Sequence, residues 1–289
     1  MIAIFGYAFI QNAFLAGSIV AIAAAILGYF LVVRGLTFAS HALSSIGFAG
    51  AAGAVLLGVP PVYGLLVFTV AASLAISAIG QEIREQDIAI GVIMTFALGL
   101  GILFLSLYHG YAEQAYSILF GSIVGISRRD VLISACLCLG ILAALAGLGR
   151  PLFFSSFDPE LAEARGVPVR VLGALFLVIV ALTVSIAIQV VGVLLVFALL
   201  VGPAATAVRL VRTPGRAIAL AALLGLIYTW LGILLASLTP WPVSFFIATL
   251  SFGVYLPVRL IARPVRLRGA PPASTASAAR LPPDEPSHG

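Results

Sequence analysis

The feature that most constrains this chain is a succession of long apolar runs separated by short polar links. A helix that crosses a bilayer needs roughly 20 consecutive apolar residues and satisfies its backbone hydrogen bonds internally. The runs of this kind lie near residues 7–33, 38–58, 62–80, 88–107, 131–149, 170–189, 191–208, 217–237 and 242–261. Their apolar residues are continuous rather than alternating, unlike those of a membrane β-barrel. The sequence therefore predicts an all-α fold, a polytopic transmembrane helical bundle of about nine spans.

The composition agrees with a chain that lies in lipid. Hydrophobic residues make up 62% of it and charged residues only 9%, whereas about 25% of the residues in soluble domains are charged. The formal charge of +5 comes mostly from arginine. In a membrane protein such charge reports orientation, so we expect no nucleic-acid partner. Cys136 and Cys138 lie within one apolar run and are expected to be buried thiols rather than a metal site.

The basic links predict the orientation of the bundle, because arginine favours the cytoplasmic side of a membrane. These links are Arg34, 81–87, 209–216 and 259–268. All of them lie inside only if the number of spans is odd and the N-terminus is outside, which nine spans satisfy. The segment "SRRD" (127–130) then lies outside, unless residues 114–127 form an extra or re-entrant segment. The predicted count therefore stays between eight and ten.

The chain divides into a transmembrane domain, residues 1–268, and a C-terminal tail. The tail, residues 269–289, is rich in Pro, Ala and Ser. Such a composition cannot bury enough apolar surface to fold, so we expect a disordered cytoplasmic segment.

The longest polar interruption, residues 149–170, contains the pattern of a short capped helix. In "DPELAEARG", Asp158 is a candidate N-cap, Pro159 occupies the first helical position and Gly166 follows the end. One interpretation is an interfacial helix within a loop. The other is a rigid projection near residues 158–166 that docks a soluble partner and transmits its motion.

The stretch "FASHALSSIGFAG" places an ionisable residue, His41, one helical turn from Ser44 and Ser45 in an otherwise apolar run. Ionisable residues inside a membrane are costly and tend to face the bundle interior or a cavity. His41 is therefore either a residue of a transport pathway or a histidine satisfied by a hydrogen bond between helices.

A proline interrupts the apolar run 191–208, where Gly202 precedes Pro203. Proline removes a helical hydrogen bond, and broken backbone at membrane depth is tolerated where it faces protein or a water-filled cavity. We expect a kinked or broken helix at Gly202 and Pro203, close to a pathway.

Two segments, residues 31–64 and 161–215, resemble the membrane permease of the zinc/manganese/iron family of ATP-binding-cassette importers. The resemblance runs from about residue 5 to 262, and "VGVLLVFALLVGPAATA" is its most specific part. The stretch "LAEARGVPV" is also similar to the coupling segment of cobalamin and iron–siderophore permeases.

The resemblance implies the permease subunit of a bacterial importer in the cytoplasmic (inner) membrane, which is not itself an enzyme and has no permanently bound cofactor. Two copies would form a homodimer with the path for a divalent zinc, manganese or iron ion at their interface. Separate ATPase subunits would hydrolyse ATP at the cytoplasmic face, and a metal-binding protein would deliver the ion from outside. The helix near 158–166 would be the coupling helix seated in the ATPase. Its implied coupling residues are Asp158, Glu160, Glu163, Arg165 and Gly166.

The chain departs from the family pattern at the expected metal contact. The family typically carries an Asp and, four residues later, a His in the second span. Here these positions hold His41 and Ser45. A neutral imidazole can still bind such a metal, and the hydroxyls of Ser44 and Ser45 offer weak oxygen contacts. Asp87 matches an acidic position of the family, where it would attract a departing cation or, as we favour, cap the fourth span.

Other functions are carried as alternatives. The sequence has no Walker motif, HExxH, GxSxG or Cys cluster, so energy from ATP would come from another chain. A permease for a metal chelate is one alternative. A secondary transporter driven by an ion gradient is another, although it would need acidic or basic residues at mid-membrane.

Overall fold

The computed structural model describes residues 8–78, 83–108, 126–157 and 159–261, and within them the chain is helical and contains no strand. The helices are α1 (Ala8–Val33), α2 (Thr37–Leu56), α3 (Pro61–Ala78), α4 (Ile83–Leu107), α6 (Arg128–Phe157), α7 (Pro159–Ala164), α8 (Val169–Val191), α9 (Val193–Leu210), α10 (Pro214–Leu238) and α11 (Val243–Ile261). Of the described helices, eight are long and apolar enough to cross a membrane, and α9 is a shorter apolar helix. The predicted all-α bundle of eight to ten spans is confirmed. The tail beyond residue 268 lies outside the described residues.

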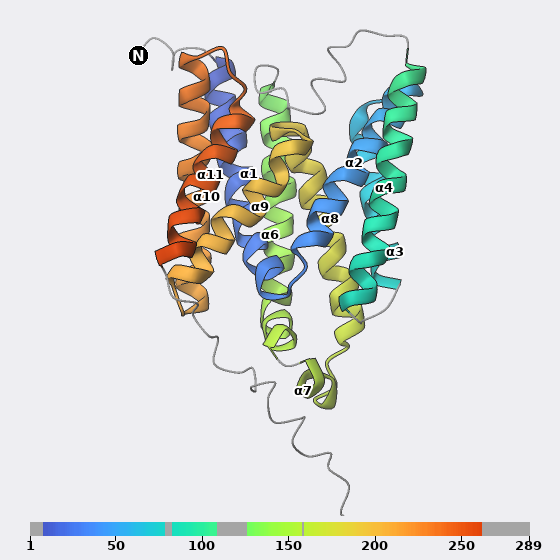
Figure 1. The fold of residues 1–289 in the computed structure, drawn as a ribbon, viewed down its shortest axis with the longest axis vertical. Coiled ribbons are helices and arrows are strands. Elements are labelled where there is room, and N and C mark those ends of the chain that lie inside the picture. The colour runs from blue at the N-terminus through green and yellow to red at the C-terminus, as the bar shows by residue number, and fades with distance from the viewer. Residues whose placement is uncertain (1–7, 79–82, 109–125, 158, 262–289) are drawn as a thin grey trace, which may run out of the picture.

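The helices alternate in direction along the long axis of the molecule, and α7 projects from one end (Figure 1). We call this end the α7 end. The α1–α2 and α9–α10 turns, which carry Arg34 and Arg212, lie toward the α7 end, whereas α6 starts with Arg128 at the opposite end. Arg34 and Arg212 therefore share the end from which α7 projects, and the positive-inside rule predicts that this end is cytoplasmic.

Helices α1, α2 and α8 form the centre of the bundle. The most apolar part of α2 is 78% buried, whereas that of α4 is only 17% buried. Helix α2 packs against α3, α4, α8 and α9, and α1 packs against α6, α8, α9 and α10. The outer helices present apolar side chains such as Leu139 of α6 to the surroundings. Cys138 is buried as expected, but the expectation for Cys136 is wrong, because it is exposed on α6.

Small residues allow two of the central contacts. A Cβ atom added to Gly50 of α2 would collide with the backbone of Gly64 of α3, and the reverse is also true. A Cβ atom on Gly28 of α1 would collide with the carbonyl of Leu200 in α9. The backbones of these helices therefore touch, as glycine permits between helices in lipid.

Helix α6 is longer than its apolar run. The run was expected to end near residue 149, but the helix continues through Pro151 to Phe157. Leu152 and Ser155 of this extension are buried. Burial of the extension against the bundle offsets the hydrogen bond that Pro151 removes. The extension leads directly to α7, which projects from the end of the bundle.

The helix break that was expected at Gly202 and Pro203 does not occur there. Helix α9 runs unbroken through both residues, and the Thr206 hydroxyl donates a hydrogen bond to the Gly202 carbonyl at 2.8 Å. Close packing of α9 against neighbouring helices holds it together across the proline. The chain breaks instead at Gly192, which has φ 84° and ψ 159° and separates α8 from α9.

Candidate functional site

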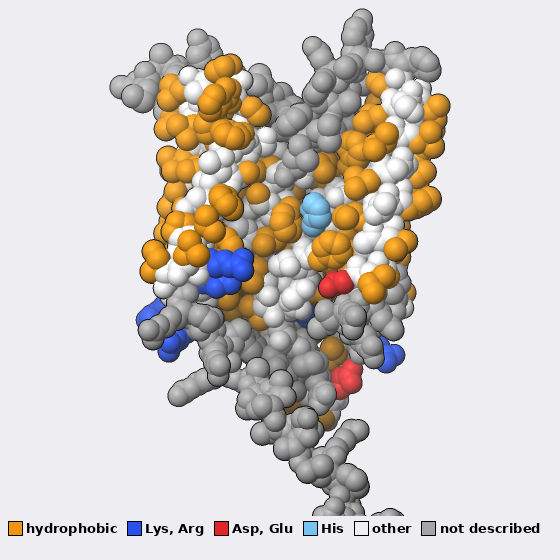
Figure 2. Space-filling model, viewed as in Figure 1, with side chains coloured by type: hydrophobic (Ala, Val, Ile, Leu, Met, Phe, Trp, Pro, Cys, Tyr) orange, Lys and Arg blue, Asp and Glu red, His pale blue; other side chains and the backbone are white. Residues whose placement is uncertain are grey.

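His41 lies in the second turn of α2 with its side chain exposed. Its ring meets the ring of Phe197 in α9 edge-on, with 5.0 Å between the centroids. Figure 2 shows a histidine on the open face of the molecule, between two columns of hydrophobic side chains. Within the described residues, His41 makes no hydrogen bond through its side chain to another helix. The imidazole nitrogens are thus free to bind a ligand that passes along this face.

Ser44 and Ser45, the predicted weak oxygen contacts beside His41, are buried and direct their hydroxyls to their own helix. Ser44 is 1% exposed, and its hydroxyl donates to the carbonyl of Ser40 at 3.0 Å. The Ser45 hydroxyl donates to the carbonyl of His41 at 3.1 Å. Both hydroxyls satisfy themselves on their own helix, a common arrangement for serine in membrane helices. No group of three or more His, Cys, Asp or Glu side chains that could hold a metal occurs in the described ranges.

The sequence suggested that Asp87 caps α4, but the structure shows that it does not. The helix begins at Ile83, so Asp87 is its fifth residue and its side chain is exposed. Helix α4 starts earlier because Glu, Arg and Gln, which precede Asp87, favour helices.

Asp87 lies nearer the α7 end than His41 does. Gly91 of α4 is level with Phe38 of α2, since a Cβ on Gly91 would lie 4.0 Å from the Phe38 ring. Asp87 precedes Gly91 by four residues in α4, and His41 follows Phe38 by three residues in α2. Along the helix axes, His41 and Asp87 are therefore separated by roughly 10 Å. Figure 2 shows an acidic side chain below the histidine on the same face. The two residues are successive positions on one face rather than one binding site.

The short helix α7 is built as its sequence pattern predicted. Pro159 is its first residue, and Gly166 follows its end with φ +79°. The N–H of Gly166 donates to the carbonyl of Glu163, and that of Val167 donates to the carbonyl of Ala162. These two bonds form a Schellman C-cap, which gives the helix a fixed end. Asp158 itself lies outside the described residues.

Contacts to α6 hold α7 in place while its outer surface stays free. Ala162 is fully buried, and the Arg165 guanidinium lies 5.5 Å from the centroid of the Phe154 ring. Glu163 and Arg165 are exposed at the α7 end. The structure describes the backbone of Glu160 but not its side chain. Helix α7 therefore presents charged groups on a rigid support.

Arg34 directly follows the last residue of α1, at the α7 end. Its guanidinium lies 5.2 Å from the centroid of the Phe176 ring of α8. Burial lowers the pKa of Arg34, because a cation loses hydration there. The contact pins the end of α1 to α8.

One polar residue of the spans escaped the sequence analysis. Gln189 is exposed near the end of α8, three residues before the break at Gly192. The signal for it was present, since "IAIQVVGVLL" holds a single amide in a long apolar run.

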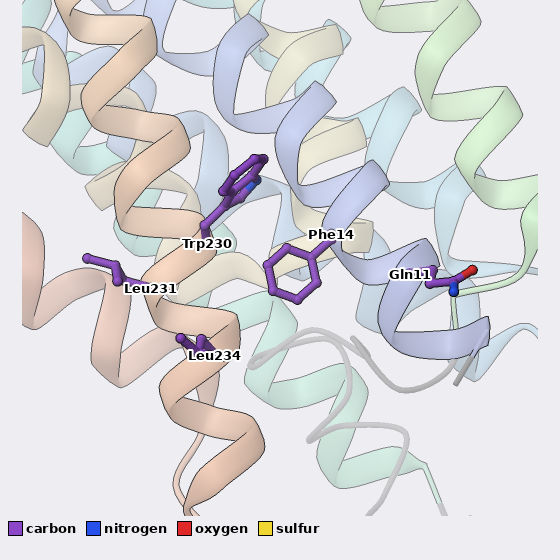
Figure 3. A pocket seen from close by; sticks show the side chains of 5 residues that line it. All are labelled: Gln11, Phe14, Trp230, Leu231 and Leu234. Carbon is purple, nitrogen blue, oxygen red and sulfur yellow. The ribbon is translucent and has the colours of Figure 1, made fainter. Parts of the chain in front are cut away.

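A separate concave region lies between α1 and α10, close to the end opposite α7. It is a cavity of about 440 Å³. Its lining residues, seen in Figure 3, are Gln11, Phe14, Trp230, Leu231 and Leu234. The Trp230 indole N–H donates to the hydroxyl of Ser18 at 2.8 Å. The cavity is lined almost wholly by apolar groups, so it does not offer the ligands that a metal ion needs.

This chain is similar to known membrane proteins of metal transport systems. The model of the ABC 3 transport family matches residues 6–262. The manganese transport system membrane protein MntC of Halalkalibacterium halodurans is 33% identical over 228 residues, which are 78% of each chain. A probable iron transport system membrane protein of Haemophilus influenzae is 31% identical, with 72% of this chain and 76% of the relative covered.

A solved structure has the same fold. PsaBC from Streptococcus pneumoniae in complex with Fab contains a chain that is 30% identical, with a TM-score of 0.80. The match covers 91% of this chain and 96% of that chain.

Proposed function

The chain belongs to the ABC 3 transport family, and we propose that it admits a divalent transition-metal cation to the cell, manganese before iron or zinc. It is a multi-pass membrane permease of the metal-importing ATP-binding-cassette kind. The observation that carries the choice of manganese is the likeness to MntC, which is 33% identical over 78% of both chains. Iron follows because another relative is named as an iron transport protein.

We propose that the cation moves along the face that carries His41. The exposed imidazole supplies a neutral nitrogen ligand, which suits zinc, iron and manganese alike. A single imidazole per chain binds weakly, as conduction requires, because the ion must leave again. The exposed carboxylate of Asp87, roughly 10 Å nearer the α7 end, then attracts the cation toward the cytoplasm.

The energy for this movement comes, in our proposal, from separate ATPase subunits that grip α7. The support for this is the exposed charge on a capped, clamped helix, since a flexible loop would not transmit motion. Glu163 and Arg165 face outward for a partner, and Gly166 fixes the end of the helix.

We also propose that the permease acts as a homodimer across the His41 face. One chain offers one imidazole, and a second copy would add another from the opposite side. A metal-binding protein on the outer side would deliver the ion. The exposed position of His41 on an open face supports this arrangement.

The test is uptake of radioactive manganese, iron and zinc by a strain that lacks the gene, with and without the restored wild-type chain. We expect restoration to raise manganese uptake most. Manganese uptake that is the same in both strains, with no gain for iron or zinc, would refute the proposal.

A metal chelate is the second candidate cargo. The observation that favours it is the setting of His41, whose ring lies 5.0 Å from the Phe197 ring among apolar side chains and would suit an organic ligand. Competition separates the two cargoes. A chelate that blocks uptake of labelled chelate, while free metal does not, would favour the second candidate.

A further inference from the structure

The imidazole of His41 lacks the partner that usually fixes a metal-binding histidine. Such a histidine generally donates its second ring N–H to a carboxylate, a carbonyl or water, and this bond sets the orientation of the ring. Within the described residues, the His41 side chain makes no hydrogen bond or ion pair, and its recorded interaction is the contact with the Phe197 ring. A histidine that binds a passing cation here needs another source of orientation.

The ring of Phe197 is placed to supply that orientation. The centroids of the two rings lie 5.0 Å apart, and the ring planes make an angle of 65°. Edge-to-face aromatic pairs have centroids about 4.5–7 Å apart and stabilise more than their buried area alone would. His41 is exposed, whereas Phe197 is half-buried. Phe197 is thus the better-held member of the pair, and its ring restricts the rotamers that the imidazole can adopt.

Helix α9 gives Phe197 a rigid support. Leu200 follows Phe197 by three residues, and its carbonyl lies against Gly28 of α1 with no room for a Cβ atom. Val196 and Leu199, on either side of Phe197 in the chain, are buried. Helix α9 also packs against α10 and α11. The Phe197 backbone therefore cannot move away from His41 unless the contacts of α9 as a whole change.

We propose that Phe197 is a positioning residue for metal import, whose ring holds the His41 imidazole in the orientation that binds the cation. The inference rests on the proposed function and deepens it, because it adds a residue that acts through His41. Phe197 itself has no ligand atom for a metal. Without its ring the imidazole nitrogen is still present but free to rotate, so each binding event must first order the side chain, which weakens binding.

The test is a double-mutant cycle on manganese uptake by the full permease with its ATPase and metal-binding protein in proteoliposomes. Phe197→Leu keeps an apolar side chain but removes the ring. We expect it to lower manganese uptake about fivefold, the effect of losing one aromatic pair. In a His41→Ala background the same change should have no effect, because no imidazole is left to position. A role in packing alone would lower uptake by the same factor in both backgrounds.

Two further variants serve as controls. Phe197→Tyr keeps the ring and should import manganese within about twofold of the wild type. Phe252→Leu removes a ring that is 63% exposed on α11, away from the cycle, and should match the wild type. Should Phe197→Leu fail to reach the membrane, Phe197→Met takes its place, because methionine fills irregular space without a ring.

The outcomes separate this inference from the proposed function. Wild-type uptake in Phe197→Leu, together with a loss in His41→Ala, would overturn the inference alone. Equal losses from Phe197→Leu in the two backgrounds would also overturn it, since the ring would then act on packing. A wild-type complex that imports no metal, or a His41→Ala complex that imports as much as the wild type, would refute the proposed path and this inference with it.

Discussion

At the scale of single residues, the sequence located the histidine but not its surroundings. An ionisable side chain in an apolar run stands out because lipid makes it costly. The partner of His41 is Phe197, and no pattern joins two residues so far apart in the chain. Helical spacing placed Ser44 beside His41, but spacing does not tell an exposed hydroxyl from a buried one that bonds its own helix.

Replacing His41 with Ala should lower metal import more than it lowers the amount of protein in the membrane. The side chain is exposed, so its loss leaves no buried cavity, but it removes the nitrogen ligand from the path. We expect a loss of about tenfold, as for a contact to an ion worth ~1.4 kcal/mol. The measurement is manganese uptake divided by the amount of permease on a membrane blot.

Ser44→Ala is the matched control for His41→Ala. The Ser44 hydroxyl donates only to the carbonyl of Ser40, so its removal should leave import within about twofold of the wild type. Equal losses of uptake and protein in His41→Ala would indicate a packing role for the imidazole.

At the scale of helices, the sequence predicted most elements but placed one break at the wrong residue. Proline is a strong helix breaker in water, so Pro203 drew attention away from Gly192. Packing keeps α9 helical through Pro203, because α9 is enclosed by α1, α10 and α11. Gly192 gave a weaker signal, since glycine is common in membrane helices. Its φ of 84° became evident only in the fold.

Exchanging each of these two residues for Ala should have opposite consequences. Gly192→Ala puts a side chain on a backbone with φ 84° and ψ 159°, which costs of order 1–3 kcal/mol. Pro203→Ala lies within a continuous helix and should be neutral or stabilising. Thermal unfolding of the two purified variants in detergent checks this. A Gly192→Ala protein as stable as Pro203→Ala would contradict the role given to the break.

Gly166→Pro should uncouple transport from ATP hydrolysis. Proline cannot adopt the φ of +79° found at Gly166, and it lacks the N–H that donates to Glu163. The cap of α7 would be lost while the spans stay intact. We expect normal insertion into the membrane together with loss of most ATP-driven uptake and weaker capture of the ATPase.

The control for Gly166→Pro is Gly173→Ala in α8. A Cβ atom at Gly173 meets nothing within 4 Å, so uptake should be unchanged. Normal uptake by Gly166→Pro would count against coupling through α7.

At the scale of the whole molecule, the hydrophobic pattern was enough to predict the architecture. Each apolar run became a helix because lipid leaves the backbone no other partner, and the described turns that carry Arg34 and Arg212 lie toward the α7 end. The arrangement of the helices around one another was beyond the pattern, since nearly every face of every span is apolar. Which face stays open therefore depends on contacts such as that between Gly50 and Gly64.

A cysteine at position 41 tests the proposed assembly directly. In a homodimer whose path runs between the two copies, the His41 side chains approach each other across the two-fold axis, so His41→Cys should form a cross-linked dimer in native membranes. The background needs Cys136 and Cys138 replaced by Ala, because Cys136 is exposed. Both variants are treated in native membranes with a short bismaleimide and run on a non-reducing gel. Leu139→Cys is the control, because Leu139 is 70% exposed on α6. This variant should stay monomeric. If His41→Cys forms no cross-linked dimer, or no more of it than Leu139→Cys does, the two His41 side chains do not face each other. The basis for a path shared by two copies would then be removed.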